Sequence, residues 1–269
     1  MGEQADIAKL IGALDDLWKE GEHEEALAGA VRLTEAYPRS SEAFEKLALL
    51  RIHHAASNPP EDQLAPALDA LNRALELESR NLEAREIRAN LFLLLAHQLG
   101  DPTFFQHSLK DFLELEHIAP DESADRLARW RLEAARSAFL AARNSPNENA
   151  NYALAAELFA RTDPEALEAG DWFFRGLALR ELAERNDSRR DHRAAAHSFL
   201  RALEVGGFET EARYFAADSL LSLDDLSGDE IAQAEKLVAE LATLPRRDFV
   251  MDTLVQRLKL RKKLMEGNE

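Results

Sequence analysis

The sequence predicts an all-α fold made of helix–turn–helix hairpins repeated in tandem. Three observations lead to this prediction: the composition, a recurring helical spacing of apolar residues, and regularly spaced breaker residues. Hydrophobic residues make up 46% of the 269 residues, enough to form a core. Ala, Leu, Glu and Arg dominate, and proline numbers only 9. These residue types favour helices, and the scarcity of β-branched residues disfavours strands.

The formal net charge of -17 argues against two classes of partner. Phosphate backbones and anionic membranes would be repelled over most of such a surface, so we expect no nucleic-acid binding and no membrane insertion. The C-terminal region is a local exception, and two interpretations of it stay open. Its cations either favour the C-terminal end of a helix dipole or form a docking patch for an acidic partner; they are Arg257, Lys259, Arg261, Lys262 and Lys263.

The sequence contains no cysteine, and no apolar run reaches the length of a membrane span. The segment 1–10 includes Glu3 and Asp6 and lacks the apolar region of a signal peptide. We therefore expect a cytoplasmic protein. A periplasmic location is the alternative, if a signal peptide has been removed.

Four stretches share one pattern, which begins near Gly21, Gln63, Ser108 and Ala195. Each has a small residue, apolar residues four and seven positions later, and then a breaker. This spacing places the apolar residues on one helical face and then stops the helix. The breakers are about 41 residues apart, at Pro38, Ser79, Pro120, Pro164, Gly207 and about Arg246.

A second helix is expected before each such helix. We predict these first helices at Ser41–Ala56, Leu82–Leu99, Glu122–Arg143, Glu165–Arg185 and Thr210–Ser222. Turn-forming residues separate the two members of each pair, as in Asn58-Pro59-Pro60, Gly100-Asp101-Pro102 and Ser227-Gly228-Asp229. The chain, 1–269, is thus predicted to be one repeat domain of about six hairpins with a C-terminal capping helix. The predicted hairpins are 3–38, 41–79, 82–120, 122–164, 165–207 and 210–245, and the capping helix is 247–265.

Several of these residues resemble the tetratricopeptide repeat. The stretch from Lys19 to Leu27 resembles that family's turn and second-helix start. Ala74-Leu75-Glu76-Leu77 resembles a second-helix end, and Ala43-Phe44 with Leu47-Ala48 resembles the next first helix. Small residues also recur at Ala89 and Gly176, where the resemblance implies a close approach of two helices. The resemblance implies a right-handed αα-superhelix, or solenoid.

The resemblance is strong in the first two or three repeats and poor around Trp130 and Tyr152. The family's usual repeat has 34 residues, and here several repeats are longer by about seven. Seven residues are roughly two helical turns, so one extra turn on each arm keeps both apolar faces in register. An array of HEAT-like repeats, which are about this long, is the alternative.

No motif for chemistry stands out. The sequence has no Walker loop, dinucleotide-binding glycine motif, zinc-protease motif or nucleophile elbow. Two Glu-x-x-His spacings occur, at Glu20/His23 and Glu114/His117, but Gly21 predicts a turn inside the first. Paired carboxylates such as Asp15-Asp16 are not distinguished from the general acidic surface. We therefore expect no catalytic activity, no metal and no cofactor.

In the family that the chain resembles, first helices line a concave groove that holds peptides or segments of partner proteins. The corresponding positions here are Glu42, Glu45, Leu49 and Ile52, then Arg85, Arg88, Asn90 and Leu93, and then Trp172, Phe173, Leu177 and Arg180. A family variant clamps a C-terminal carboxylate with Lys and Asn, but the matching positions here hold Ile11, Asp15, Glu45 and Leu49.

Alternatives remain for the notable residues of this set. Successive helical residues point about 100° apart, so Trp172, Phe173 and Phe174 cannot all face one core. At least one is expected to reach the groove, or else Trp172 and Phe174 pack into the core. Phe104-Phe105 is either a staple at a hairpin tip or an exposed contact site. Arg85, Arg88 and Arg180 either bind a partner's carboxylates or pair with acids of the chain itself.

These observations favour a non-catalytic scaffold or adaptor that binds a protein or peptide partner. The alternative is a bacterial envelope, secretion or assembly accessory protein with the same fold. An enzyme or metal protein that uses a bundle-like interior is the third hypothesis. Self-association is left open by the sequence.

Overall fold

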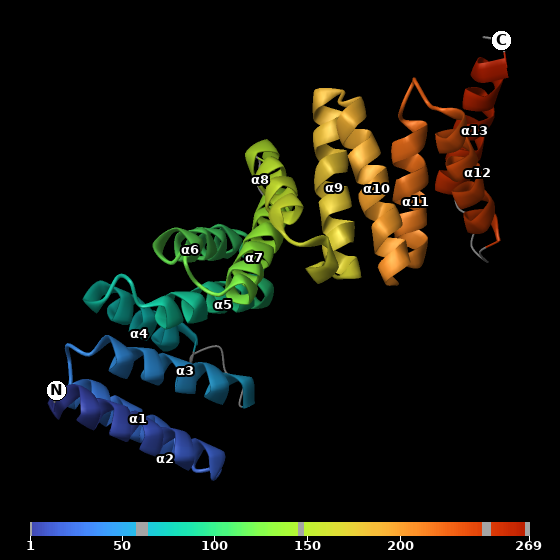
Figure 1. Cartoon of the computed structure of the whole chain (residues 1–269). Coiled ribbons are helices and arrows are strands. Elements are labelled where there is room, and N and C mark those ends of the chain that lie inside the picture. The colour runs from blue at the N-terminus through green and yellow to red at the C-terminus, as the bar shows by residue number, and fades with distance from the viewer. Residues whose placement is uncertain (1, 58–63, 145–147, 244–248, 267–269) are drawn as a thin grey trace. The chain divides into compact units, whose positions relative to one another are not determined.

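The computed structural model describes residues 2–57, 64–144, 148–243 and 249–266, and within these ranges it contains α-helices and no β-strand. The predicted all-α class is therefore confirmed. The helices follow one another along the chain (Figure 1). They are α1 (Gly2–Lys19), α2 (His23–Ala36), α3 (Ser41–Ser57), α4 (Leu64–Leu77), α5 (Leu82–Leu99), α6 (Thr103–Ile118), α7 (Ala124–Arg143), α8 (Glu148–Arg161), α9 (Ala169–Asn186), α10 (Arg189–Val205), α11 (Glu209–Leu221), α12 (Gly228–Ala242) and α13 (Phe249–Glu266).

Consecutive helices pack against each other in two runs, as a helical solenoid requires. From α1 to α6 every consecutive pair is in contact, and the same holds from α8 to α13. Odd-numbered helices also contact each other directly, in the pairs α1 with α3, α3 with α5, and α11 with α13. The odd-numbered helices are thus the first helices of successive hairpins. After α1, they start at Ser41, Leu82, Ala124, Ala169, Glu209 and Phe249.

The chain divides into two compact units, Met1–Ser137 and Ala138–Glu269. The division falls inside α7. Unit 1 holds the stack from α1 to α6 and most of α7, and unit 2 holds the stack from α8 to α13 (Figure 1).

Alanine and leucine build the core of unit 1. In α4, Leu64, Ala67, Leu71 and Ala74 are all buried, at spacings that place them on one helical face. Alanine lets neighbouring helices approach closely, and leucine fills the space between them. Larger aromatic side chains take this role in both units, and those that are almost fully buried are Phe112, Trp130, Phe139, Phe159 and Phe199.

Helix ends match several of the turn residues in the sequence. The Asn81 and Ser188 side chains accept hydrogen bonds from backbone N–H groups in the first turns of α5 and α10. Ser227 and Glu230 form a reciprocal capping box at the start of α12. Gly100 follows α5 with a φ of 66°, a left-handed conformation that glycine adopts without strain. Such caps fix where each arm of a hairpin stops.

Gly176 permits a close contact between α9 and α10, as the sequence predicts. A Cβ atom at this position would lie 2.7 Å from the ring of Phe199, a distance that real Cβ atoms do not tolerate. Phe199 is fully buried. The absence of a side chain at Gly176 therefore sets the distance between the two helices.

The predicted start of a first helix at Glu165 is wrong, because α9 begins at Ala169. A 3₁₀ helix, Pro164–Ala166, comes first, and the Asp163 side chain accepts from the backbone N–H of Glu165. Leu167 is then extended and buried, which interrupts the helix. The predicted turn at 58–60 and the predicted boundaries at 245, 246 and 247 lie outside the described residues.

Candidate functional site

Polar contacts join the odd-numbered helices to one another within each unit. In unit 1, Lys46 of α3 pairs with Asp15 of α1. Arg126 of α7 donates to Glu86 of α5 at 2.7 Å. In unit 2, Arg180 of α9 donates to Asp218 of α11 at 3.2 Å. Such contacts fix one first helix against the next, so the surface that these helices share is held in a defined geometry.

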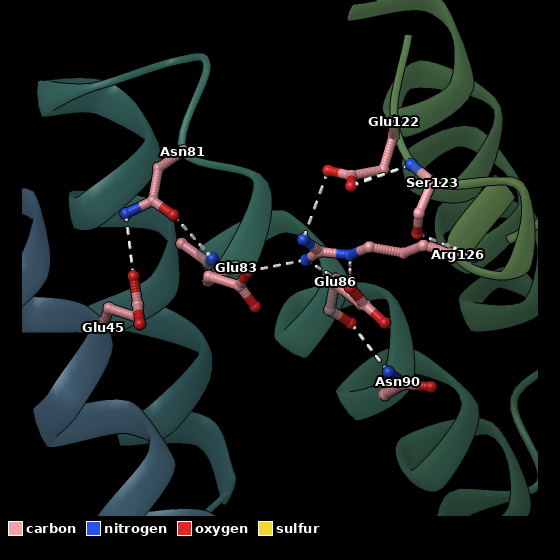
Figure 2. A network of polar contacts seen from close by, with 9 residues as sticks. Glu45, Asn81, Glu83, Glu86, Asn90, Glu122, Ser123 and Arg126 are labelled. Carbon is pink, nitrogen blue, oxygen red and sulfur yellow. Dashed lines mark hydrogen bonds and ion pairs between the residues drawn. The ribbon is translucent and has the colours of Figure 1, made fainter. Parts of the chain in front are cut away.

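Arg126 is the centre of one of these clusters (Figure 2). Its guanidinium donates to Glu83 at 2.7 Å, to Glu86 at 2.7 and 3.1 Å, and to Glu122, which lies just before α7, at 3.5 Å. It also lies 5.0 Å from the ring of Trp130. Burial by itself would lower the pKa of Arg126, but the hydrogen bonds to Glu86 and Glu83 outweigh it and the pKa is raised.

Asn81 links the start of α5 to α3. Its side-chain oxygen caps α5 by accepting from the N–H of Ala84 at 2.9 Å, and its amide nitrogen donates to Ser41 and Glu45, both at 2.9 Å. Figure 2 shows Glu45 turned toward this amide. Burial raises the pKa of Glu45 and the Asn81 hydrogen bond opposes this change, while the nearby carboxylate of Glu83 adds to it.

A recess of about 450 Å³ opens beside the Arg126 cluster, between α5 and α7. We call it the α5–α7 recess. Its lining combines acidic, amide, basic and aliphatic side chains, which are those of Glu83, Glu86, Ile87, Asn90, Arg126 and Arg129. A second recess, of about 440 Å³, lies near the start of α1 and is lined in part by Glu3, Arg39, Glu42 and Glu78. The α5–α7 recess is the better candidate site, because its walls are already held in place by the Arg126 hydrogen bonds.

Two of the predicted groove residues line one or the other of these two recesses. Asn90 is exposed and lines the α5–α7 recess, where its amide donates to the backbone oxygen of Glu86. Glu42 is exposed and lines the second recess. Glu45 and Leu49 are half-buried on α3.

Arg85 and Arg88 do not supply free donors to a groove, because both pair with Asp111 of α6. Asp111 is only 2% exposed. Arg88 donates to its two carboxylate oxygens at 2.8 and 2.7 Å, and Arg85 donates to it at 3.2 Å. Of the two alternatives that the sequence left open, internal pairing is the one observed, with Asp111 as the partner. The two arginines fasten α5 to α6.

Trp172 and Phe173 are also interior residues rather than groove contacts. They are 3% and 7% exposed. Phe174 is half-buried and stacks on Phe139 at 5.0 Å. The core alternative named Trp172 and Phe174, and the fully buried pair is Trp172 and Phe173 instead. Arg180 pairs with Glu184 at 2.6 Å and with Asp218 at 3.2 Å, so its charge is compensated within unit 2.

The Phe104–Phe105 pair packs at the end of its hairpin. Phe105 is 6% exposed, and Phe104 stacks on Phe92 of α5 at 6.0 Å. The staple interpretation is therefore the observed one. Neither ring is an exposed contact site.

Sequence reasoning missed Glu83, Glu86, Arg126 and Arg129, although the signal for the first two was present. In α3, Glu42 and Glu45 come six and three residues before the small residue Ala48. The same offsets from Ala89 lead to Glu83 and Glu86, not to Arg85 and Arg88. Arg126 and Arg129 lie in the region where the repeat pattern is poor, so no such alignment points to them.

Neither metal binding nor membrane crossing gains support from the described residues. Within them, no group of three or more His, Cys, Asp or Glu side chains is arranged to hold a metal ion. His23, one member of a Glu-x-x-His spacing, stacks on Trp18 at 4.2 Å. Across the same ranges, no helix is both long enough and apolar enough to cross a lipid bilayer.

No protein-family model matches the chain, and no curated protein sequence matches it either. Solved structures share its fold. PilF of Pseudomonas aeruginosa is similar with a TM-score of 0.51 at 14% identity, over 95% of this chain and 99% of that chain. The C-terminal part of a TPR repeat-containing protein from Cytophaga hutchinsonii has a TM-score of 0.51 at 13% identity, over 96% and 99%. The MamA RS-1 ArsTM double mutant has a TM-score of 0.50 at 17% identity, over 74% and 94%. Likeness at these identities establishes the fold.

Proposed function

Because the chain has the helical-hairpin fold of tetratricopeptide-repeat proteins, we propose that it is a non-catalytic scaffold that binds a segment of a partner protein. The proposed binding site is the α5–α7 recess. The single observation that supports this choice is the recess itself, which lies between two first helices and is lined by Glu83, Glu86, Ile87, Asn90, Arg126 and Arg129.

The lining has the composition of a recognition surface. Its polar groups are carboxylates, an amide and guanidinium groups, which suit hydrogen bonds and ion pairs with a partner. Glu83 keeps 61% of its side chain exposed, and Asn90 and Arg129 are exposed as well. These groups are available to a partner, while Arg126 and Glu86 hold the walls in place. Preorganised walls lower the entropy cost of binding.

The charges favour a partner segment with lysine or arginine side chains. Glu42 and Glu45 on α3 extend the acidic surface from Glu83 on α5. The neighbouring carboxylates of Glu83 and Glu42 both contribute to the raised pKa of Glu45, which indicates that these acids repel one another. A cation from the partner would relieve this repulsion, and Ile87 offers apolar contact beside it.

A site-specific photocrosslinker tests the position of the site. We expect a crosslinker at Asn90 to capture one defined segment of a partner protein in native cells. The same group at Gln106, which is exposed on α6, is the matched control and should not capture that segment. Equal capture at both positions, or none at Asn90, would contradict the proposal.

The charge preference has a separate test with the captured segment as a synthetic peptide. Glu83→Lys is expected to weaken its binding about tenfold or more, because it replaces attraction by repulsion at the rim. Glu76→Lys makes the same charge change on α4, outside the recess, and should leave the affinity within about twofold. An equal loss for both variants would mean that only net charge matters and that the recess is not the site.

A further inference from the structure

Two exposed leucines lie one helical turn apart on α13. Leu260 is 58% exposed and Leu264 is 50% exposed, although Leu254 and Leu258 of the same helix are buried. In α11, Leu220 lies at the same distance from the start of its helix as Leu260 does in α13, yet Leu220 is only 5% exposed. Helix α13 packs against α11 and α12 on one side. Within the described residues, nothing covers the side that carries Leu260 and Leu264.

Lysines flank these leucines. Lys259 and Lys263 are exposed and form no ion pair with any described residue. By contrast, Arg257 forms an ion pair with Asp218, and Lys262 forms one with Glu235. In a chain with a net charge of -17, this face of α13 is an apolar and basic surface. A surface complementary to this face of α13 would be acidic and would have room for two leucine side chains.

Helix α1 presents such a surface. Leu10 is 44% exposed, and the small residue Ala13, three positions later on the same side of the helix, is exposed too. Asp6 lies one turn before Leu10 and is also exposed, whereas Asp16 pairs with Lys19 at 3.5 Å. Asp6, Leu10 and Ala13 are spaced so that they lie on one helical face. Ala13 leaves room for a leucine of a second helix, and Asp6 lies where it can meet a lysine.

We propose that copies of this chain associate head to tail, with α13 of one copy docked on α1 of the next. Leu260 and Leu264 pack beside Leu10 and over Ala13, and Lys259 or Lys263 pairs with Asp6. Two copies of α13 facing each other would instead bring like charges together, which disfavours a symmetric dimer through this helix. A head-to-tail contact leaves one α1 and one α13 free, so further copies can add. This inference does not depend on the partner site between α5 and α7.

Sedimentation velocity over a range of protein concentrations tests for self-association. We expect the wild-type chain to form dimers and longer species as concentration rises, and to dissociate partly at high salt. Leu260→Glu and Leu10→Glu should each weaken the association about tenfold or more, since each places a charge in the apolar contact. Leu99→Glu is the matched control, because Leu99 is 55% exposed but belongs to α5, and it should leave the association unchanged. Circular dichroism checks that each variant remains helical.

A mixing experiment distinguishes head-to-tail docking from any symmetric contact. Each single variant keeps one intact end, so Leu260→Glu and Leu10→Glu mixed in equal amounts should form a heterodimer and stop there. Wild-type protein that stays monomeric at millimolar concentration would overturn the proposal. So would a mixture of the two variants that remains monomeric, or a Leu99→Glu variant that dissociates as readily as Leu260→Glu.

Discussion

The Arg88 guanidinium on α5 donates to both carboxylate oxygens of Asp111 on α6, at nitrogen–oxygen distances of 2.8 and 2.7 Å. Arg85 donates to the same carboxylate at 3.2 Å. This carboxylate is buried, and the two arginine side chains are 13% and 20% exposed. The contact couples the two helices of one hairpin through a charge network that excludes most solvent. The net attraction in this network contributes little to stability, whereas removal of one charged group would leave another buried charge unpaired at a large cost in free energy.

Replacement of Asp111 is expected to destabilise the protein strongly. Asp111→Ala leaves two largely buried cations without their carboxylate, which should lower the free energy of unfolding by about 3–5 kcal/mol. Urea denaturation followed by circular dichroism measures this loss. Glu76→Ala removes an exposed carboxylate that pairs with Arg73 at 2.9 Å, and it should cost no more than about 1 kcal/mol. Similar losses for the two variants would show that the Asp111 network has no special role.

Gly176→Ala is expected to lower the free energy of unfolding by about 1–3 kcal/mol, because the new methyl group overlaps the Phe199 ring. Gly12→Ala is the control, since a Cβ there meets nothing within 4 Å and alanine favours a helix. It should raise stability by up to about 1 kcal/mol. Thermal unfolding compares the variants. Phe199→Leu should lower the free energy of unfolding less in the Gly176→Ala variant than in the wild type, because it removes the overlap with the new methyl group. Equal losses in the two backgrounds would contradict the close-contact explanation.

His192 should make unit 2 less stable in mild acid. Burial lowers the pKa of His192 from its ordinary value of 6.5, and the charges of Arg180 and Arg257 lower it further, while Glu184 and Asp218 oppose the change. Nδ1 of this imidazole is buried without a hydrogen-bond partner among the described residues. As pH falls through 6.5, the unfolded chain takes up a proton that the folded chain does not, so stability decreases.

The His192→Leu variant lacks the imidazole that titrates. Its free energy of unfolding should therefore change less than that of the wild type as the pH falls from about 7.5 toward the lowered pKa of His192. Urea denaturation at a series of pH values gives both profiles. His117→Leu serves as the control, because His117 is exposed on α6 in unit 1. Parallel profiles for the wild type and His192→Leu would refute the assignment.

Glu45 should show the opposite dependence on pH. Burial raises its pKa above the ordinary value of 4.5, so the folded state resists ionisation of this carboxyl. Ionisation of Glu45 therefore costs the folded state free energy. This cost is absent at a pH below the pKa that Glu45 has in the unfolded chain. It grows as the pH rises toward the pKa in the folded chain and is complete above that value. Glu45→Gln retains an oxygen that accepts from Asn81 and removes the charge. The variant should therefore be more stable than the wild type at pH 7.

The stability difference between Glu45→Gln and the wild type should disappear as pH falls below 4.5. Chemical denaturation at pH 7 and pH 4 measures it. Glu35→Gln is the control, since Glu35 is exposed on α2, and it should give no such pH-dependent gain. A constant difference at both pH values would show that burial of the charge is not the cause.

Part of the candidate site followed from the local pattern, and part did not. Asn90 lies in the α5–α7 recess as the repeat alignment predicts. Arg85 and Arg88 differ from the neighbouring groove positions by only one or two residues, but on a helix that displacement turns a side chain by 100° or more. Their side chains consequently meet Asp111 instead of the recess. Their positive charge made these arginines candidates for binding a partner's carboxylates, and the same charge lets them pair with Asp111 within the chain.

The sequence by itself determined the all-α class, the order of the hairpins and most helix boundaries. These properties depend on local physics: helix-forming residues, apolar spacing on one face, and stops such as Gly100 that end a helix wherever they occur. Tertiary structure decided which charged and aromatic side chains remain available. Asp111 lies more than twenty residues from Arg88, and only packing of α5 on α6 brings them together. Pairing and burial between helices depend on such distant neighbours, so a single helix does not encode them.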